Sequence, residues 1–162
     1  MHSSVPRGPR RTHGGRSAGF TLLELLLAIV VVGTLTTLAI SSYASHMRQA
    51  RVSRAIGDIA SIEARIAAFQ ATNNQLPASL AQIGASALLD PWGHPYRYLD
   101  FAGLNGTAQM RKDRNLVPIN SDYDLYSTGE DGSTLPPLLA PVSHDDVIRA
   151  NSGGFVGLAT DY

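Results

Sequence analysis

The chain has 162 residues, which is enough for one domain and one long helix. Its thirteen basic and thirteen acidic residues cancel, and no basic cluster follows the first nineteen positions, so the charge does not favour nucleic-acid binding. The lack of cysteine excludes a disulfide-braced domain and cysteine-based catalysis.

Residues 1–19 have the composition of a leader rather than of a folded segment. They contain four arginines and no acidic residue, and are otherwise rich in Gly, Ser and Pro. Such a segment cannot form a core. The small residues Ala18 and Gly19 precede an apolar run, whereas the cleavage site of an ordinary signal peptide follows one. Cleavage after Gly19 would keep the apolar run. The alternative is a disordered cytoplasmic tail on a membrane anchor.

The apolar run spans 21 residues, from Phe20 to Ile40, and Glu24 is its only charged residue. About 20 apolar residues in a helix cross a bilayer, so we expect a transmembrane helix over 20–41. The basic leader places the N-terminus in the cytoplasm and the C-terminal domain outside. A carboxylate within such a run needs a partner. Alternatively, Glu24 lies at the membrane interface, where the helix dipole favours it.

Helix signals continue beyond the apolar run, over residues 42–71. No proline occurs between Pro9 and Pro77, so one continuous helix is expected from about residue 20 to 71. Apolar residues at spacings of three and four predict an amphipathic second half. This stripe consists of Val52, Ile56, Ile59, Ile62, Ile66 and Phe69.

Residues 72–162 are expected to form a globular domain. Short alternating segments bounded by turn residues predict a small antiparallel sheet laid on the long helix, with a C-terminal loop region, which is an α+β fold. The expected elements are a short helical or irregular segment over 78–88, a turn at Asp90–Gly93, strands over 96–99 and 123–127, and an edge strand over 116–119, where Pro118 excludes a central position.

The segment Gly19-Phe20-Thr21-Leu22-Leu23-Glu24 resembles the processing site of the type IV pilin-like family. The resemblance implies that a prepilin peptidase cleaves between Gly19 and Phe20 and methylates the new amino group of Phe20. It also implies that Glu24 acts in filament assembly, where the free amine of a neighbouring Phe20 is its expected counter-charge. Gly33 matches a glycine frequent in the family, whereas Ser41 stands where many members have proline.

Two later segments, Asp90-Pro91-Trp92-Gly93 and the loop 127–132, narrow the resemblance to the major pseudopilin, the G-type, of type II secretion. The implied partners are identical and related pilin-like subunits in a helical filament, the prepilin peptidase and an inner-membrane assembly platform. The implied location is the inner membrane, with the C-terminal domain in the periplasm. A major or minor subunit of a surface type IV pilus is the alternative.

In that family the loop holds a calcium ion through aspartates, and the matching positions are Asp131 and either Asp145 or Asp146. Calcium prefers six to eight oxygen ligands, which this acidic region could supply. The chain departs from the family over 133–143, a Leu- and Pro-rich stretch, and again over 151–155. The alternative is a solvated acidic loop in which Asp146 caps a short helix over 147–150.

An enzymatic function is not expected. His94, His144 and Asp145 are present, but no G-x-S-x-G segment and no histidine pair with metal spacing accompanies them. The remaining alternative from another class is a membrane-anchored calcium- or ligand-binding module that never polymerises.

Overall fold

The structure, a computed structural model, describes residues 19–162, except for the side chains of residues 38–42. Residues 1–18 of the predicted leader lie outside the described residues. Two compact units divide the chain, Met1–Ser42 and Tyr43–Tyr162. The boundary between them falls at the point where the apolar run gives way to the amphipathic segment.

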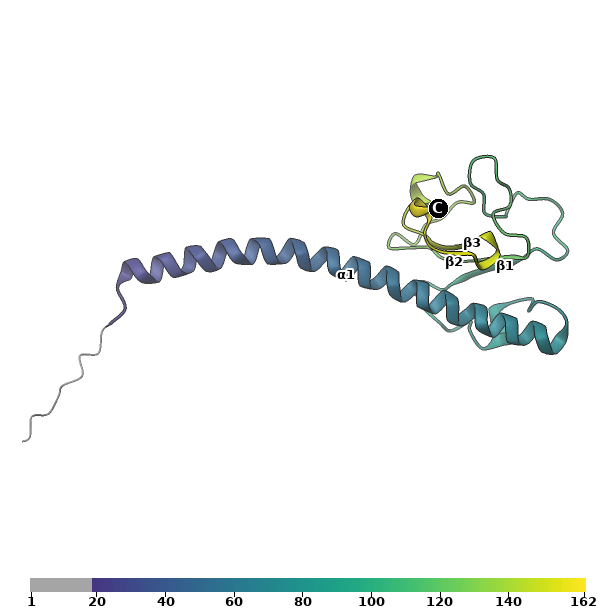
Figure 1. Cartoon of the computed structure of the whole chain (residues 1–162), viewed down its shortest axis with the longest axis horizontal. Helices are drawn as coiled ribbons and strands as arrows, with labels where there is room; N and C mark the ends of the chain where they lie inside the picture. The colour runs from purple at the N-terminus through teal and green to yellow at the C-terminus, as the bar shows by residue number, and fades with distance from the viewer. Residues whose placement is uncertain (1–18) are drawn as a thin grey trace, which may run out of the picture. The chain divides into compact units, whose positions relative to one another are not determined.

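One helix, α1 (Leu22–Asn73), confirms the predicted long helix (Figure 1). Thr21 precedes it as the N-cap, since the Thr21 hydroxyl accepts a hydrogen bond from the backbone N–H of Glu24 at 3.2 Å. The helix ends where Asn74 adopts a positive φ of 54° and donates its N–H to the carbonyl of Gln70. Both ends are therefore specified by local sequence.

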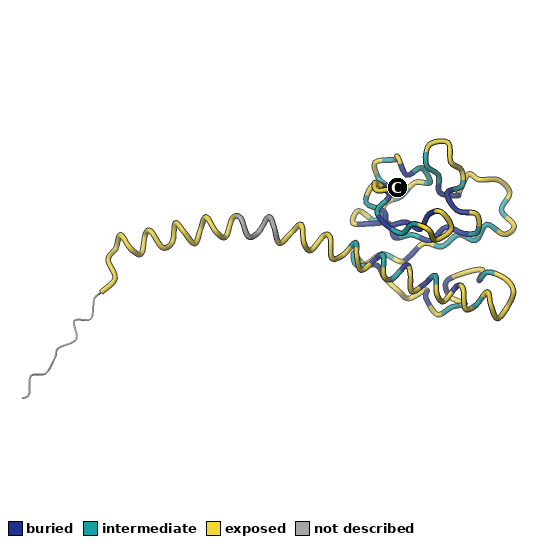
Figure 2. Tube along the Cα trace, viewed as in Figure 1, coloured by how far each residue is buried: buried dark blue, intermediate teal, exposed yellow. Residues whose placement is uncertain are grey.

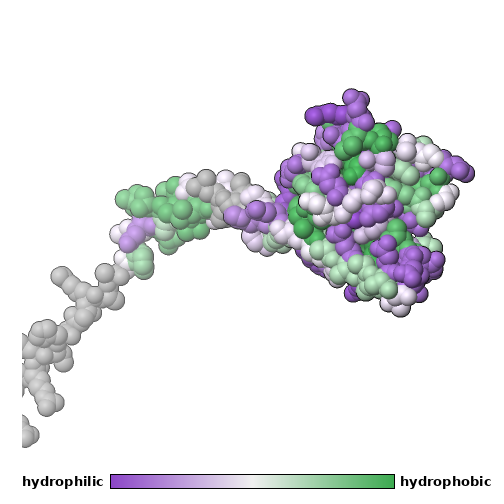
Figure 3. All heavy atoms as spheres, turned by 45° about the vertical axis from the view of Figure 1, so that its right-hand side comes forward, coloured by the Kyte–Doolittle hydropathy of each residue, from purple (hydrophilic) through white to green (hydrophobic). Residues whose placement is uncertain are grey.

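In the first unit, residues 22–37 of α1 are exposed on every side of the helix (Figure 2). They are also strongly apolar, as Figure 3 shows for the face in view. The large exposed residues are Leu22, Leu23, Leu25, Leu26, Leu27, Ile29, Val30, Val31, Val32 and Leu35. A helix that is apolar all round is normally covered by other apolar material. No helix in the part of the chain that the structure describes is both long enough and apolar enough to cross a membrane.

The second unit contains a four-stranded antiparallel sheet in the order β1-β2-β3-β4, so each strand pairs with the next one along the chain. The predicted strands over 96–99 and 123–127 are confirmed, and β2 has the predicted bounds. The strands are β1 (Arg97–Asp100), β2 (Tyr123–Ser127), β3 (Val147–Ala150) and β4 (Phe155–Leu158). A short 3₁₀ helix, η1 (Leu80–Ile83), accounts for the predicted helical segment after α1.

The sheet packs against the second half of α1 and buries its apolar stripe (Figure 1). Ile59, Ile62 and Ile66 are at most 1% exposed and contact a cluster that includes Leu125 and Val147. Burying one such side chain stabilises a fold by about 1.5–3 kcal/mol. The predicted stripe is therefore confirmed, and it holds the domain on the helix.

The opposite face of the sheet is covered by the C-terminal loops. Successive residues of a strand point to opposite faces, so Ile148 faces away from α1 while its neighbour Val147 faces the helix. A second cluster forms there from Ile148, Ala150, Ile119, Leu138 and Ala159. Strand β3 is consequently buried on both faces.

Two expectations about the sheet are wrong. The segment 116–119 is not a strand, because Leu116 pairs only with Asp113 of its own loop and Pro118 has no N–H to donate to a ladder. The short helix considered over 147–150 is instead β3, which pairs with β2 and β4. Its β-branched residues favour a strand once neighbours exist on both sides.

Candidate functional site

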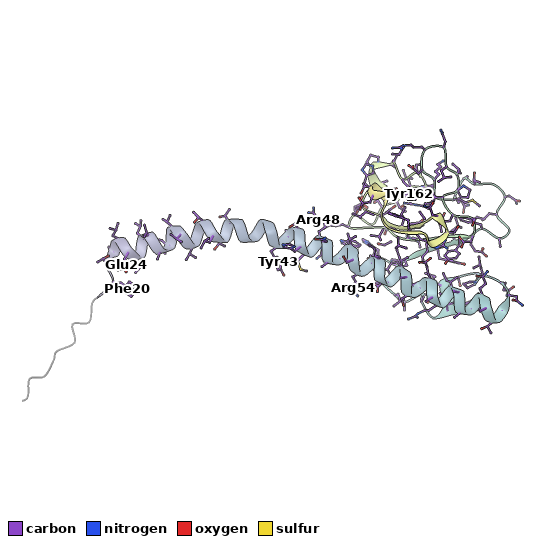
Figure 4. The ribbon with its side chains drawn as sticks, viewed as in Figure 1. Phe20, Glu24, Tyr43, Arg48, Arg54 and Tyr162 are labelled. Atoms are coloured by element: carbon purple, nitrogen blue, oxygen red, sulfur yellow. The ribbon has the colours of Figure 1, made fainter. Side chains whose placement is uncertain are left out.

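The predicted processing and assembly residues lie together at the start of α1. Phe20 is 82% exposed and precedes the helix, and Glu24 lies in the first turn of the helix (Figure 4). Both line a shallow hollow whose other walls are apolar residues of one helix face, among them Leu27, Ala28 and Val31. A Cβ added at Gly19 would meet nothing within 4 Å. The predicted cleavage position is thus exposed, and the Glu24 carboxylate shares an apolar surface with Phe20.

The predicted turn at 90–93 is tied to strand β2 through Asp90, which is only 4% exposed. Its Oδ1 accepts hydrogen bonds from the backbone N–H groups of Trp92 and His94, at 3.0 and 2.8 Å. Its Oδ2 accepts one from the hydroxyl of Ser127 at 2.5 Å. This carboxylate therefore shapes the turn and joins it to the end of β2.

The following loop requires two glycines. Gly129 and Gly132 have positive φ angles of 65° and 69°, which disfavour other residues. A Cβ at Gly129 would lie 2.4 Å from the backbone oxygen of Asp145, and one at Gly132 would lie 2.8 Å from the His94 ring. The loop 127–132 thus packs closely against both the turn at residues 90–94 and the acidic residues that precede β3.

The three predicted calcium ligands make different contacts. Oδ2 of Asp145 accepts hydrogen bonds from the N–H groups of Glu130 and Asp131, at 2.6 and 3.0 Å. Oδ1 of Asp131 accepts one from the N–H of Ser133 at 2.7 Å. Asp146 is fully buried. Among residues 19–162, no three acidic or histidine side chains come close enough together to hold a metal ion.

Arg111 is the partner of Asp146. Its guanidinium is 2% exposed and donates to Oδ2 of Asp146 at 2.5 Å, to the hydroxyl of Thr134 at 2.5 Å and to the carbonyl of Leu135 at 2.8 Å. It also lies 4.5 Å from the centre of the Tyr126 ring. Burial raises the pKa of Asp146, and the charge of Arg111 opposes this shift. A calcium ion that used Asp146 would face a positive charge, so Asp146 does not fit as a calcium ligand.

The comparisons with known proteins agree with the two motifs. Residues 15–40 match the family described as the prokaryotic N-terminal methylation motif. The chain is also 30% identical over 140 residues to the type II secretion system core protein G of Pseudomonas aeruginosa, a match that covers 72% of this chain and 86% of that protein. The chain belongs to the type II secretion system core protein G family. The corresponding proteins of Pectobacterium carotovorum subsp. carotovorum and Klebsiella pneumoniae are each 27% identical, over 85% and 93% of their lengths. No solved structure matches significantly.

Membership of the core protein G family agrees with the α+β fold and with the resemblance drawn from residues 19–24. The methylation motif covers the expected cleavage position and residues 20–40 of the predicted transmembrane helix. The name of the relatives describes a component of a secretion system rather than a catalyst. The residues considered for an enzyme make separate contacts. Nδ1 of His94 lies 3.0 Å from the carbonyl oxygen of Gly129, whereas His144 and Asp145 line a different, largely apolar groove.

The sequence analysis did not identify Arg149, which joins the sheet to α1. Arg149 lies on β3, is 4% exposed and donates from Nε to Glu63 of α1 at 2.6 Å. Its two terminal nitrogens bind both oxygens of Asp122 at 2.8 Å, and its guanidinium carbon lies 4.0 Å from the centre of the Tyr123 ring. An arginine between apolar residues of a short segment was the available signal, but its partners are 86 and 27 positions away.

The electrostatics of this ion pair are favourable. Burial alone would raise the pKa of Asp122, but the hydrogen bonds from Arg149 and from the backbone N–H of Tyr123, together with the charge of Arg149, hold that pKa below its usual value. A lowered carboxylate pKa contributes stability above the pKa of the unfolded chain, and this contribution is lost as the pH falls through the folded value. Arg149 and Asp122 therefore remain an ion pair at neutral pH.

Proposed function

We propose that the chain is a structural subunit of a type II secretion pseudopilus, a filament that it builds through α1 to drive protein export. The observation that carries this proposal is the part of α1 in the first unit, which lies largely within the methylation motif and exposes apolar side chains on every side over residues 22–37. Such a surface calls for a covering partner, because exposed apolar area of this extent is unfavourable in water.

Two successive partners would cover this helix. Before assembly, the segment 20–41 is proposed to lie in the inner membrane, with the N-terminus in the cytoplasm and the C-terminal domain in the periplasm. Prepilin peptidase then removes residues 1–19 and methylates Phe20. An assembly platform moves the subunit into the filament, where identical and related helices replace the lipid. The chain does no chemistry of its own in this scheme.

Secretion in a strain that lacks the gene tests the proposal. We expect the culture medium to lose the enzymes exported by the type II system, and wild-type protein to restore them. The variant Gly19→Leu should fail to restore export, because the peptidase cleaves after Gly19 while the folded part of the chain is unaffected. Gly57→Ala is the matched control, since Gly57 lies in the second unit and an added Cβ there also meets nothing within 4 Å. Full export by Gly19→Leu would contradict processing as a requirement.

A further inference from the structure

We propose that the guanidinium of Arg111 is the built-in cation of the C-terminal loops, so that this domain folds without calcium. Calcium was expected here because the loop resembles the calcium-binding loop of the family and because the acidic residues of this region could supply oxygen ligands. The charge at their centre is instead supplied by the chain itself, since Arg111 and Asp146 are 2% and 0% exposed and hydrogen-bonded to each other. This inference does not depend on the proposed filament function.

Arg111 gathers oxygens from separate segments, which is the structural task of a bound metal ion. It lies in the connection between β1 and β2, while Thr134 and Leu135 belong to the stretch after the Gly-rich loop and Asp146 directly precedes β3. The hydroxyl of Thr134 also donates to Oδ2 of Asp146 at 2.7 Å, which closes a ring of three groups. Removing the positive charge would therefore release three segments together.

The backbone beside Arg111 holds the same stretch. The N–H of Lys112 donates to the carbonyl of Pro136 at 3.0 Å, and the N–H of Leu138 donates to the carbonyl of Lys112 at 2.9 Å. Thr134, Pro136 and Leu138 all lie in the Leu- and Pro-rich stretch 133–143, where the chain departs from the calcium-binding pattern. Side-chain hydrogen bonds from Arg111 and backbone hydrogen bonds of Lys112 thus hold the stretch 133–143 together.

Each partner of this ion pair keeps one buried polar atom without a hydrogen-bond partner among the described residues, Oδ1 of Asp146 and Nε of Arg111. The Arg111 donor would repel a metal ion beside it, whereas Oδ1 of Asp146 is the oxygen of this pair that a water molecule or a cation could still bind. The other carboxylate, Asp145, already accepts hydrogen bonds from two backbone N–H groups.

Thermal unfolding of the purified full-length chain, with EDTA and with millimolar calcium chloride, tests the proposal. We expect the wild-type Tm to be the same in both solutions. Arg111→Gln should lower the Tm by roughly 10 °C or more in both, because Asp146 is left buried without its counter-charge. Arg97→Gln is the matched control, since Arg97 is exposed on β1, and it should leave the Tm unchanged.

Two further variants keep the test informative if Arg111→Gln does not fold. Arg111→Lys retains the charge, and we expect it to fold with an intermediate Tm that EDTA does not change. The double variant Arg111→Met with Asp146→Leu should recover most of the lost Tm, because it removes both charges. The proposal is overturned if EDTA lowers the wild-type Tm and Asp146→Asn abolishes that effect. It is also overturned if Arg111→Gln melts like the Arg97→Gln control.

Discussion

Replacing Arg149 with methionine is expected to lower the free energy of unfolding of the domain by about 3 kcal/mol. The substitution removes one buried cation that binds Glu63 on α1 and Asp122 before β2. Loss of one partner of a buried ion pair usually costs about 3–5 kcal/mol. The lower end applies here because the side chains of Glu63 and Asp122 are 21% and 33% exposed and can regain water.

Urea unfolding of the purified chain measures this loss, which is large against a typical domain stability of about 5–15 kcal/mol. Arg54→Met is the matched control, because Arg54 is exposed and forms a surface pair with Asp58 at 3.7 Å. A surface pair of this kind contributes about 0–1 kcal/mol. Equal losses in the two variants would show that Arg149 does not hold α1 to the sheet.

Replacing Glu24 with alanine is expected to reduce filament yield by roughly a hundredfold. In a packed filament the carboxylate would lose water and pair with the amine of a neighbouring Phe20, and leaving that amine buried alone costs about 3 kcal/mol or more. Every 1.4 kcal/mol is about tenfold in an equilibrium. The helix start should survive, because Thr21 caps the backbone N–H of Glu24 and not its side chain.

Electron microscopy and quantification of sheared filaments from cells that overproduce the secretion system measure the yield. Glu130→Ala is the matched control, since Glu130 is an exposed glutamate of the second unit that lies 3.9 Å from Arg51. We expect this control to assemble normally. If Glu24→Ala also assembles normally, the glutamate interacts only with the helix dipole and has no role in filament packing.

The elements that depend on local sequence could be predicted. The bounds of α1 follow from a long pattern without proline, and the stripe Ile59, Ile62 and Ile66 is buried as its spacing predicts. The turn at Asp90 and the strand β2 also carry their own signals, a Pro–Gly pair and an alternation of apolar residues. These features require no knowledge of distant partners.

The elements that depend on distant partners could not be predicted. Strands β3 and β4 have only four residues each. The connection between them places Asn151 and Ser152 at positive φ, a conformation that the sequence does not predict. Four residues are too few to separate a strand from a helix by pattern alone, and the equally short β1 could be predicted because it alternates directly after a recognisable turn. The sheet therefore appeared smaller from the sequence than it is.

The candidate site divides in the same way. Gly19, Phe20 and Glu24 are adjacent in sequence, so one motif identified them together. Arg111 and Asp146 are 35 positions apart, and their pairing depends on the loop packing of the whole domain. The family resemblance suggested Asp131 and either Asp145 or Asp146 as calcium ligands, but the sequence does not show that Asp146 meets Arg111.

The N-terminal residue of the protein isolated from its native cells tests the central claim most directly. If the chain is a processed pilin-like subunit, mass spectrometry will find a mature protein that begins at N-methylated Phe20 and lacks residues 1–19. If cells that secrete normally contain only protein that retains Met1 and the basic leader, the account is contradicted.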